Sequence, residues 1–193
     1  MLRIATEKDV DSILRIYTPY IQHSTATFET AVPSPEEFTD RFRQITEKMP
    51  WLVWEENGKV LGYAYGSIPF SRAAYAWCAS LSVYLLPEAQ GKKIGSQLCL
   101  KLEDLLRTMG YRVIYAIITA ENEGSVHFHK KLGYQPVGFF PDCGFKMGHW
   151  LGVTWMEKRL NPVDIPTEPP KPWSCIVENA ELFQNILAIL PIS

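Results

Sequence analysis

The sequence predicts an α/β (α+β) domain over residues 1–160, followed by a proline-rich extension. The chain has 193 residues, of which 47% are hydrophobic and 21% charged, so it can bury one sizeable core. Segments with the apolar spacing of amphipathic helices alternate with segments patterned as strands. Cap and turn residues separate most of these segments, which favours the same assignment.

The first elements are a strand and two helices. Apolar and polar residues alternate at Leu2–Ile4, as expected of a short strand. Apolar residues then fall at i, i+3, i+4 and i+7 and predict an amphipathic helix: Val10, Ile13, Leu14 and Tyr17. A second helix follows Ser34, because Ser34 can cap it, Pro35 suits its first turn and Glu37 can complete a capping box. Pro50 ends this helix.

A hairpin and a further strand come next. Trp51–Glu55 and Val60–Ser67 have the composition of strands, and they flank a turn pair. That pair is Asn57-Gly58, whose residues favour the two-residue turn of a hairpin. Trp77–Leu86 is then predicted as another strand.

Helices and strands alternate in the following segment. A loop at Gln90–Ser96 leads into a helical stripe that Gly110 closes. The stripe consists of Leu98, Leu102, Leu105, Leu106 and Met109. Val113–Ile118 is nearly all apolar, which predicts a strand covered on both faces.

The domain is expected to end with a short helix and two strands. Asn122–Ser125 caps the helix, which ends at Gly133. The strands are expected around Tyr134–Phe139 and Val153–Arg159.

The composition changes after Leu160. Prolines become frequent there: Pro162, Pro166, Pro169, Pro170 and Pro172. This stretch predicts an extended linker and excludes a helix. One helix is expected at Glu178–Leu190, so residues 161–193 are interpreted as a linker with a helical extension.

Charge and composition exclude several classes of function. The 19 Lys and Arg against 21 Asp and Glu give a net charge of −2, so no global positive field attracts nucleic acid or an acidic membrane. No window reaches the roughly 18 apolar residues of a membrane helix, and charges in Met1–Ser12 argue against a signal peptide, so we expect a cytoplasmic protein. The four cysteines form no C-x-x-C pair, so neither a metal site nor a disulfide framework is expected.

The loop Gln90–Ser96 carries the first chemical signal. A loop that enters a helix presents unpaired N–H groups and the positive end of the helix dipole, and both favour an anion. Gly91 and Gly95 leave room for the close approach of a phosphate, while Lys92 and Lys93 add positive charge. The loop is not a Walker motif. On these residues alone, a phosphate site and a solvated turn are both open.

The second chemical signal follows the apolar strand. His127 and His129 are two residues apart, so on a helix they point in different directions and cannot chelate one metal ion. Either histidine is a candidate acid or base near neutral pH, with a surface or capping role as the alternative. Asn122 is in the same way either a helix cap or a site residue.

Together these motifs resemble the GNAT acetyltransferase superfamily over about residues 2–160. The loop is similar to its [QR]-x-x-G-x-[GA] pyrophosphate signature at Gln90 and Gly95, and it departs from the middle glycine of that pattern at Lys93. An N-x-x-S…LGY pattern agrees independently: Asn122, Ser125, Leu132, Gly133 and Tyr134.

A narrower resemblance is to the phosphinothricin and methionine sulfoximine N-acetyltransferases. It is based on residues at fixed offsets: Tyr17, Thr27, Phe28, Glu29, Thr30, Pro50–Val53, Arg72, Ala74, Tyr75, Trp77, Ser82–Tyr84, Ser125, His129, Gly144–Lys146, Gly148 and Trp150. The resemblance implies an acetyl-CoA-dependent N-acetyltransferase. Its substrate would be the amine of a small amino-acid-like molecule, acetylated by direct transfer in a ternary complex.

The resemblance also implies a fold and a place for acetyl-CoA. The fold is a mixed central sheet flanked by helices, in which Leu81–Leu86 splays from Val113–Ile118. The pantetheine arm would lie in the gap and pair with backbone groups like an added strand, while the loop would hold the pyrophosphate. The implied cofactor-binding residues are Val83, Tyr84, Leu85, Gln90, Gly91, Lys92, Lys93, Ile94, Gly95, Ser96, Asn122 and Ser125.

His129 stands where the resemblance places the group that moves protons as the amine attacks and the thiolate leaves. In the phosphinothricin enzymes a glutamate commonly precedes the S/T-V-Y strand by two residues, and this chain has Ser80 there. A serine cannot replace that base. Glu29 or His129, directly or through water, is the expected substitute, unless the change marks a different substrate or reduced activity.

The resemblance implies four substrate-binding residues: Phe28, Arg72, Tyr75 and Trp77. A guanidinium can pair with a carboxylate or phosphinate, and the aromatic rings can form apolar walls. A solvated arginine and core aromatics are the alternative. Lys146 and Trp150 lie in a stretch that often contributes to a dimer-related site in such enzymes, so we expect a homodimer.

Three other interpretations are open at this point. An acetyltransferase for a protein or peptide amine would need an open acidic groove. A non-catalytic acetyl-CoA-binding module would explain Ser80 and Lys93, although the retained Asn122 and His129 argue against it. The segment Asn161–Ser193 is alternatively an interaction element joined to an enzyme.

Overall fold

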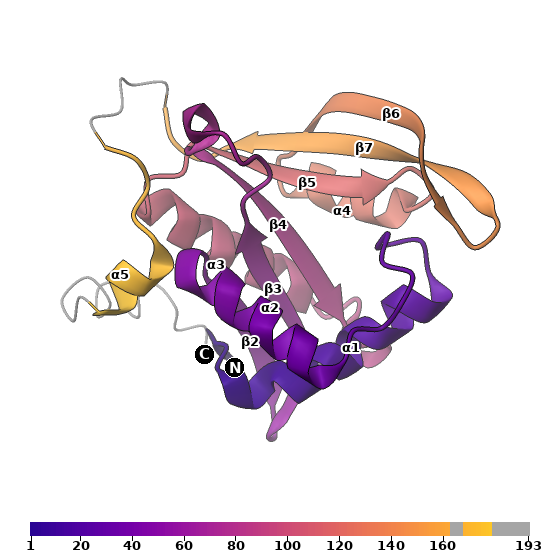
Figure 1. Cartoon of the computed structure of the whole chain (residues 1–193), viewed down its shortest axis with the longest axis horizontal. Coiled ribbons are helices and arrows are strands. Elements are labelled where there is room, and N and C mark those ends of the chain that lie inside the picture. Colours follow the sequence, from indigo (N-terminus) through magenta and orange to yellow (C-terminus); the bar gives the residue numbers. More distant parts are fainter. Residues whose placement is uncertain (163–167, 179–193) are drawn as a thin grey trace.

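The computed structural model describes residues 1–162 and 168–178, and the strands of these residues form one mixed sheet (Figure 1). Their order is β1-β2-β3-β4-β5-β7-β6. The β4–β5 pair is parallel and the other neighbouring pairs are antiparallel. The strands are β1 (Leu2–Ile4), β2 (Trp51–Glu56), β3 (Lys59–Ser67), β4 (Cys78–Leu85), β5 (Val113–Thr119), β6 (Gln135–Lys146) and β7 (His149–Arg159). The expected α/β class with a mixed sheet is confirmed.

Helices cover both faces of the sheet around β2 and β3. They are α1 (Val10–His23), α2 (Pro35–Lys48), α3 (Ile94–Thr108), α4 (Glu123–Lys131) and α5 (Trp173–Glu178). Figure 1 shows α1 and α2 on the near side of these strands and α3 behind them. Alternating side chains of β2 serve the two layers, because Trp51 and Val53 join the core beneath α1 and α2 whereas Leu52 joins the core around α3.

The predicted start of α2 is confirmed in detail. Ser34 Oγ accepts a hydrogen bond from the Glu37 backbone N–H at 3.2 Å, and the Glu37 carboxylate accepts one from the Ser34 N–H at 2.8 Å. This is the reciprocal capping box, with Pro35 in the first turn. Phe38 and Phe42 lie on the inner face of this helix and are buried. The cap thus sets where the helix begins, and the apolar stripe sets which face packs on the sheet.

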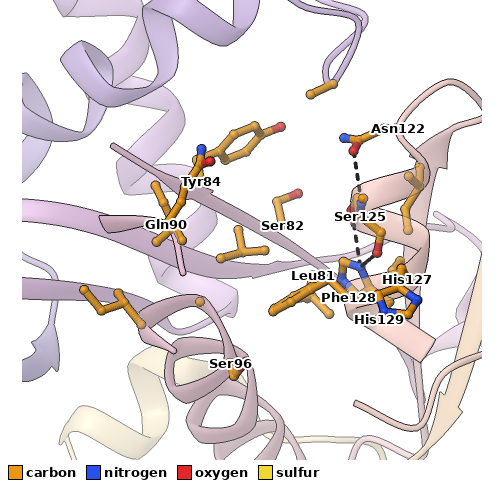
Figure 2. Close-up of a pocket in the computed structure, with 18 of the residues that line it drawn as sticks. Leu81, Ser82, Tyr84, Gln90, Ser96, Asn122, Ser125, His127, Phe128 and His129 are labelled. Atoms are coloured by element: carbon orange, nitrogen blue, oxygen red, sulfur yellow. Dashed lines mark hydrogen bonds between the residues drawn. The ribbon is translucent and has the colours of Figure 1, made fainter. Parts of the chain in front are cut away.

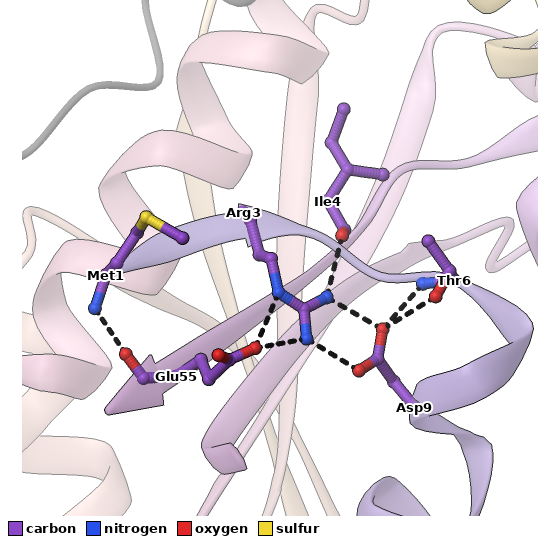
Figure 3. Close-up of polar contacts among 6 residues, drawn as sticks. All are labelled: Met1, Arg3, Ile4, Thr6, Asp9 and Glu55. Atoms are coloured by element: carbon purple, nitrogen blue, oxygen red, sulfur yellow. Dashed lines mark hydrogen bonds and ion pairs between the residues drawn. The ribbon is translucent and has the colours of Figure 1, made fainter. Parts of the chain in front are cut away.

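An arginine that the sequence analysis did not single out joins β1, the turn after it and β2 (Figure 3). The Arg3 guanidinium donates two hydrogen bonds to the Asp9 carboxylate, at 2.7 and 2.8 Å, and two to Glu55, at 2.5 and 2.9 Å. Burial raises the pKa of Asp9, but the hydrogen bonds from Arg3 and Thr6 outweigh this effect and leave the pKa below its ordinary value.

Both hairpins turn through two residues in the left-handed region. Asn57 and Gly58 have φ of 50° and 75°, as the sequence predicts for this turn. The β6–β7 hairpin is longer than predicted, because both strands continue to a turn at Met147 and Gly148 with φ of 52° and 84°. A methionine before glycine gives a weaker signal than Asn-Gly, and the register shift between Phe140 and Gly144 interrupts the alternation.

The parallel strands β4 and β5 separate after three residue pairs. They pair from Cys78 with Val113 to Ser80 with Tyr115, and beyond that point no pairing joins them among the described residues. Figure 1 shows the two arrows diverging from this point. The splay that the resemblance implies is therefore present, and it leaves strand edges facing a gap.

One expectation about β5 is wrong. The apolar run predicts a strand covered on both faces, but Ile117 is 45% exposed and Tyr115 is half-buried, whereas Ile114 and Ala116 are buried. The buried pair belongs to the core that α3 and α4 cover. The opposite face is lined by aromatic rings of neighbouring segments instead of by a helix, so apolar composition overestimates the burial of this strand.

The described part of the proline-rich extension packs on the domain. α5 begins directly after Pro172, and its Trp173 and Ile176 are buried in the core around α3. The expected helix at 178–190 lies outside the described residues apart from its first residue. Among the helices that the structure describes, none is long and apolar enough to cross a membrane.

Candidate active site

A pocket of about 590 Å³ lies in the gap between β4 and β5 (Figure 2). We call it the groove. Its walls come from β4, β5, the loop before α3, and α4, and α1 and the loop after it each add one residue. The lining residues are Tyr20, Ala26, Leu81–Leu85, Ala89–Gly91, Lys93–Ser96, Ala116–Ile118, Asn122, Gly124, Ser125, His127–His129 and Lys131.

The β4 edge of the groove presents backbone groups of alternate residues that are not directed to β3. The Leu86 N–H donates to the Leu61 carbonyl at 2.8 Å, and the antiparallel register of β3 and β4 then directs the backbone groups of Tyr84 and Ser82 to β3. The N–H and C=O groups of Leu81, Val83 and Leu85 consequently face the gap. Of the predicted strand residues, Val83 and Leu85 offer backbone groups to the groove, while Tyr84 contributes its side chain.

The loop Gln90–Ser96 surrounds the N-terminus of α3 at one end of the groove. Gly91 and Lys93 both have left-handed backbones, with φ of 75° and 63°, so Lys93 keeps the conformation for which glycine is the usual residue. A Cβ on Gly95 would lie 3.3 Å from Leu85 Cδ1, so a small residue is needed for the close contact between α3 and β4. All the predicted residues of this loop except Lys92 line the groove.

Asn122 and Ser125 fix the start of α4. The Asn122 side-chain oxygen accepts a hydrogen bond from the Ser125 N–H at 3.0 Å, which is a helix cap. Both residues also line the groove, so the capping and binding interpretations of Asn122 are compatible. In Figure 2 this cap lies directly above His129 on the same helix.

His129 lines the groove and has one ring nitrogen without a hydrogen-bond partner among the described residues. The residue is 4% exposed, and its Nδ1 lies 2.9 Å from the Ser125 carbonyl oxygen. A carbonyl only accepts, so Nδ1 carries the proton and Nε2 carries the lone pair. Nε2 is buried and has no hydrogen-bond partner among the described residues. Burial lowers the pKa of His129 below 6.5 and outweighs the opposite effect of the Ser125 contact, so the ring is neutral at pH 7.

A buried polar cluster lies behind His129. The Tyr134 ring meets the His129 ring edge to face, with 5.1 Å between centroids. Tyr134 Oη donates to the Glu103 carboxylate at 3.0 Å, and Lys158 Nζ donates to its other oxygen at 2.5 Å. The LGY motif indicated Tyr134, but no local pattern identifies its distant partners, Glu103 of α3 and Lys158 of β7.

Glu29 does not line the groove. Its carboxylate accepts a hydrogen bond from Arg41 at 2.5 Å and one from the Tyr17 hydroxyl at 3.1 Å. Ser80, at the point where β4 and β5 separate, is 7% exposed and its hydroxyl lies 2.7 Å from that of Ser67. Of the two predicted catalytic residues, the structure thus brings only His129 to the groove.

The four predicted substrate residues are not among the residues that line the groove. Arg72 is exposed at the start of a short helical turn, and Tyr75 in that turn packs on Phe70 with 4.6 Å between ring centroids. Phe28 lies against Gly144 of β6, where any side chain would overlap its ring. Trp77 is half-buried before β4.

Lys146 has a role inside its own chain. It is 5% exposed, and its Nζ donates to the carbonyl oxygens of Ser24 and Thr27, both at 2.7 Å. It therefore ties the β6–β7 hairpin to the end of α1. Trp150, by contrast, is 63% exposed.

Comparisons with known proteins agree with this geometry. The family described as "Acetyltransferase (GNAT) domain" matches residues 2–155. A phosphinothricin N-acetyltransferase of Streptomyces viridochromogenes is 32% identical over 171 residues, which cover 89% of this chain and 91% of the relative. An L-methionine sulfoximine/L-methionine sulfone acetyltransferase of Pseudomonas aeruginosa is 35% identical over 168 residues, covering 83% and 95% of the two chains.

A solved structure is similar as well. The crystal structure of a GNAT superfamily phosphinothricin acetyltransferase from Sinorhizobium meliloti in complex with AcCoA superposes with a TM-score of 0.85. The two chains are 36% identical, and the match covers 90% of this chain and 96% of that one.

Proposed function

The chain belongs to the GNAT acetyltransferase family, and from this premise we propose that it transfers the acetyl group of acetyl-CoA to the amine of a small amino-acid-like substrate of the phosphinothricin or methionine sulfoximine type. The observation that carries the proposal is the neutral, buried His129, which lines the groove between the parted strands and whose buried Nε2 has no hydrogen-bond partner among the described residues. The names of the similar proteins support the substrate class.

The groove fits acetyl-CoA in its two main parts. The left-handed loop and the α3 N-terminus suit a pyrophosphate, because they gather N–H groups, the positive end of a helix dipole and the Lys93 cation. The open edge of β4 suits the amides of the pantetheine arm, which would pair with Val83. When bound, acetyl-CoA supplies a thioester whose carbonyl carbon an amine can attack.

We assign the proton transfers to His129. An amine attacks only in its neutral form, so the site must accept a proton from the substrate and deliver one to the departing thiolate. His129 lines the groove and its Nε2 is unprotonated and without a hydrogen-bond partner among the described residues, while Glu29 is already paired with Arg41. His129, directly or through water, therefore replaces the carboxylate that Ser80 lacks. The acetyl group would pass to the amine without an acyl-enzyme.

Arg72 and the nearby aromatic residues are proposed as the substrate-recognition region. The Arg72 guanidinium is exposed and can pair with the acidic group of an amino-acid analogue in two parallel hydrogen bonds. Phe28, Tyr75 and Trp77 would then supply apolar contacts. The acceptor would enter from the face opposite α3.

We also propose a homodimer formed through the β6–β7 hairpin. Six large apolar side chains of this hairpin are more than half exposed: Val137, Phe139, Phe140, Phe145, Met147 and Trp150. An exposed apolar surface of this kind is typical of an interface. Replacing Phe145 and Trp150 by serine should give a monomer in sedimentation experiments, whereas the control Leu100→Ser on α3 should not. A monomeric wild-type protein would contradict the dimer.

A cytoplasmic location is part of the same proposal. The four cysteines all lie in the described part of the chain and all are free thiols, although Cys143 and Cys175 are exposed. Free, exposed thiols are usual where a reducing pool keeps them reduced. Locating a tagged form of the full chain by cell fractionation tests this point.

The activity is tested by thiol release from acetyl-CoA. The panel contains L-phosphinothricin, L-methionine sulfoximine, spermidine and a peptide with a free N-terminus. We expect turnover with the two amino-acid analogues, and loss of about 10²- to 10⁴-fold in kcat for His129→Gln, the size typical of general acid–base catalysis. His23→Gln at the exposed end of α1 is the matched control.

Two outcomes would overturn the substrate proposal. Turnover with the peptide alone would identify a protein or peptide acetyltransferase. No turnover with any amine, while acetyl-CoA binds, would identify a binding module.

A further inference from the structure

The hydroxyl of Tyr20 occupies part of the strand edge that the groove offers to a ligand. Tyr20 lies near the end of α1 and lines the groove. Its Oη donates a hydrogen bond to the Leu85 carbonyl oxygen at 2.6 Å, and it lies 3.4 Å from the Leu85 backbone nitrogen, from which it can accept. One side chain thus satisfies both backbone groups of a β4 residue.

The register of β4 gives this contact its significance. Leu85 and Val83 have the same parity along the strand, so their backbone groups face the gap and not β3. A ligand that pairs with β4 as an added strand uses alternate residues on one edge. Leu85 is the residue of that edge nearest the loop Gln90–Ser96, where a pantetheine arm would enter. Its backbone groups are already hydrogen-bonded to Tyr20.

We propose that Tyr20 is a gate residue of the cofactor groove, which competes with the pantetheine amides for the backbone of Leu85 and must release it when acetyl-CoA binds. The proposal rests on the proposed function. It adds a residue from α1, on the opposite side of the sheet from α3, to the control of cofactor binding.

The release is confined to the Tyr20 side chain. Lys146 holds the backbone at the end of α1, because its Nζ donates to the carbonyl oxygens of Ser24 and Thr27. The Tyr20 ring packs edge to face on Tyr84, with 5.0 Å between centroids. A side-chain rotation frees Leu85 without unwinding the helix, so release breaks only the contacts between the Tyr20 hydroxyl and the backbone of Leu85.

Tyr20→Phe tests the gate, because it keeps the ring on Tyr84 and removes only the hydroxyl. We expect this variant to bind acetyl-CoA about 2- to 10-fold more tightly than the wild type in calorimetry, the factor set by one net hydrogen bond. Its melting temperature without ligand should fall, since Leu85 loses its partner. Adenosine 3′,5′-bisphosphate, which has no pantetheine amides, should bind both proteins equally.

Tyr17→Phe is the matched control. Tyr17 lies one turn earlier in α1 and packs on the same Tyr84 ring at 4.9 Å, but its hydroxyl lies 2.7 Å from Thr27 Oγ1 and contacts the Tyr84 side chain rather than the backbone of Leu85. Its acetyl-CoA affinity should equal that of the wild type. An equal gain in both variants would mean that the gain comes from α1 as a whole, and would overturn the gate.

The two proposals fail in different ways. Unchanged or weaker acetyl-CoA binding by Tyr20→Phe, with normal binding by the wild type, overturns the gate and leaves the acetyltransferase intact. A gain that also appears with adenosine 3′,5′-bisphosphate overturns competition with the amides. A wild type that does not bind acetyl-CoA overturns both proposals.

Discussion

His129 Nδ1 lies 2.9 Å from the carbonyl oxygen of Ser125, the residue one turn earlier in α4. Because a carbonyl only accepts, this contact fixes the tautomer of the ring and leaves the lone pair on Nε2. The same helix begins at the Asn122 cap, whose side-chain oxygen accepts a hydrogen bond from the Ser125 N–H at 3.0 Å. The start of α4 and the tautomer of His129 therefore depend on backbone groups of the same residue, Ser125.

This arrangement predicts an acidic limit to activity. The pKa of His129 lies below 6.5 because of burial, and Nε2 accepts a proton only when the ring is neutral. Activity should therefore persist below pH 6.5 and decline as the pH falls through the pKa of the folded protein. A kcat profile measures this limit, and a limit above pH 6.5 would contradict the assignment.

The same pKa also predicts a loss of stability in acid. Below pH 6.5 His129 is protonated in the unfolded chain but not in the folded chain. The unfolded state therefore binds more protons, and the free energy of unfolding decreases as the pH is lowered. His129→Gln should reduce this slope in urea unfolding between pH 6.5 and 5. An equal slope in the wild type and the variant would show that other groups account for it.

Lys93 combines a backbone cost with a useful charge. Its φ of 63° costs about 1 kcal/mol relative to glycine. Lys93→Gly should therefore raise the free energy of unfolding, while Lys93→Ala should not, since alanine keeps the cost. Both variants should weaken acetyl-CoA binding, and the loss should shrink at high salt because it comes from a charge. Equal affinity of Lys93→Ala and the wild type would remove Lys93 from the anion site.

Local signals predicted most of the fold. The Ser34 cap and the Asn57-Gly58 turn are interactions between neighbours in sequence, and both are confirmed. The extension of β6 and β7 was missed, because Met147-Gly148 is a weak turn signal. The exposed face of β5 could not be predicted either, since it depends on where helices pack and not on the composition of the strand.

The same distinction between local signals and distant contacts applies to the residues of the site. The loop Gln90–Ser96 and the helix with His129 are continuous motifs, and the structure brings them to one groove. Glu29 was a candidate base because sequence does not reveal its pairing with Arg41. Tyr20 carries no local signal, because its partner is a backbone group 65 residues away.

The contact of Arg3 with Asp9 predicts a second stability effect in acid (Figure 3). Arg3→Met leaves the Asp9 carboxylate, on a 6% exposed residue, without its strongest donor, which should cost about 1–3 kcal/mol. The pKa of Asp9 is lowered in the folded protein, so the stabilisation is present above the unfolded value near 3.8 and is lost as the pH falls through the folded value. Wild type and Arg3→Met should thus converge in stability in strong acid.

Chemical unfolding at pH 7 and in strong acid measures this convergence. Arg43→Met is the control, because its pair with Glu7 is more than half exposed on both sides and should contribute little. A difference between wild type and Arg3→Met that is independent of pH would contradict the role of Asp9.

Substitutions in the cluster behind His129 should lower the stability of the protein with little effect on kcat. Glu103 is 1% exposed and receives hydrogen bonds from Tyr134 and Lys158. Lys158→Met leaves a buried carboxylate without a counter-charge and should cost about 3–5 kcal/mol. Replacing Glu103 by leucine in the same chain should restore most of that loss, because no buried charge is then left unpaired.

Tyr134→Phe tests the cluster most directly. It keeps the ring that contacts His129 and removes only the hydrogen bond from the hydroxyl to Glu103. Its stability should fall by about 1–3 kcal/mol, because one carboxylate oxygen loses its donor. Its kcat, measured well below the melting temperature, should stay within a few-fold of the wild type, with the same acidic limit. A shifted limit would mean that the hydroxyl controls the His129 proton, and the cluster would then belong to the proton path rather than to the support of α4.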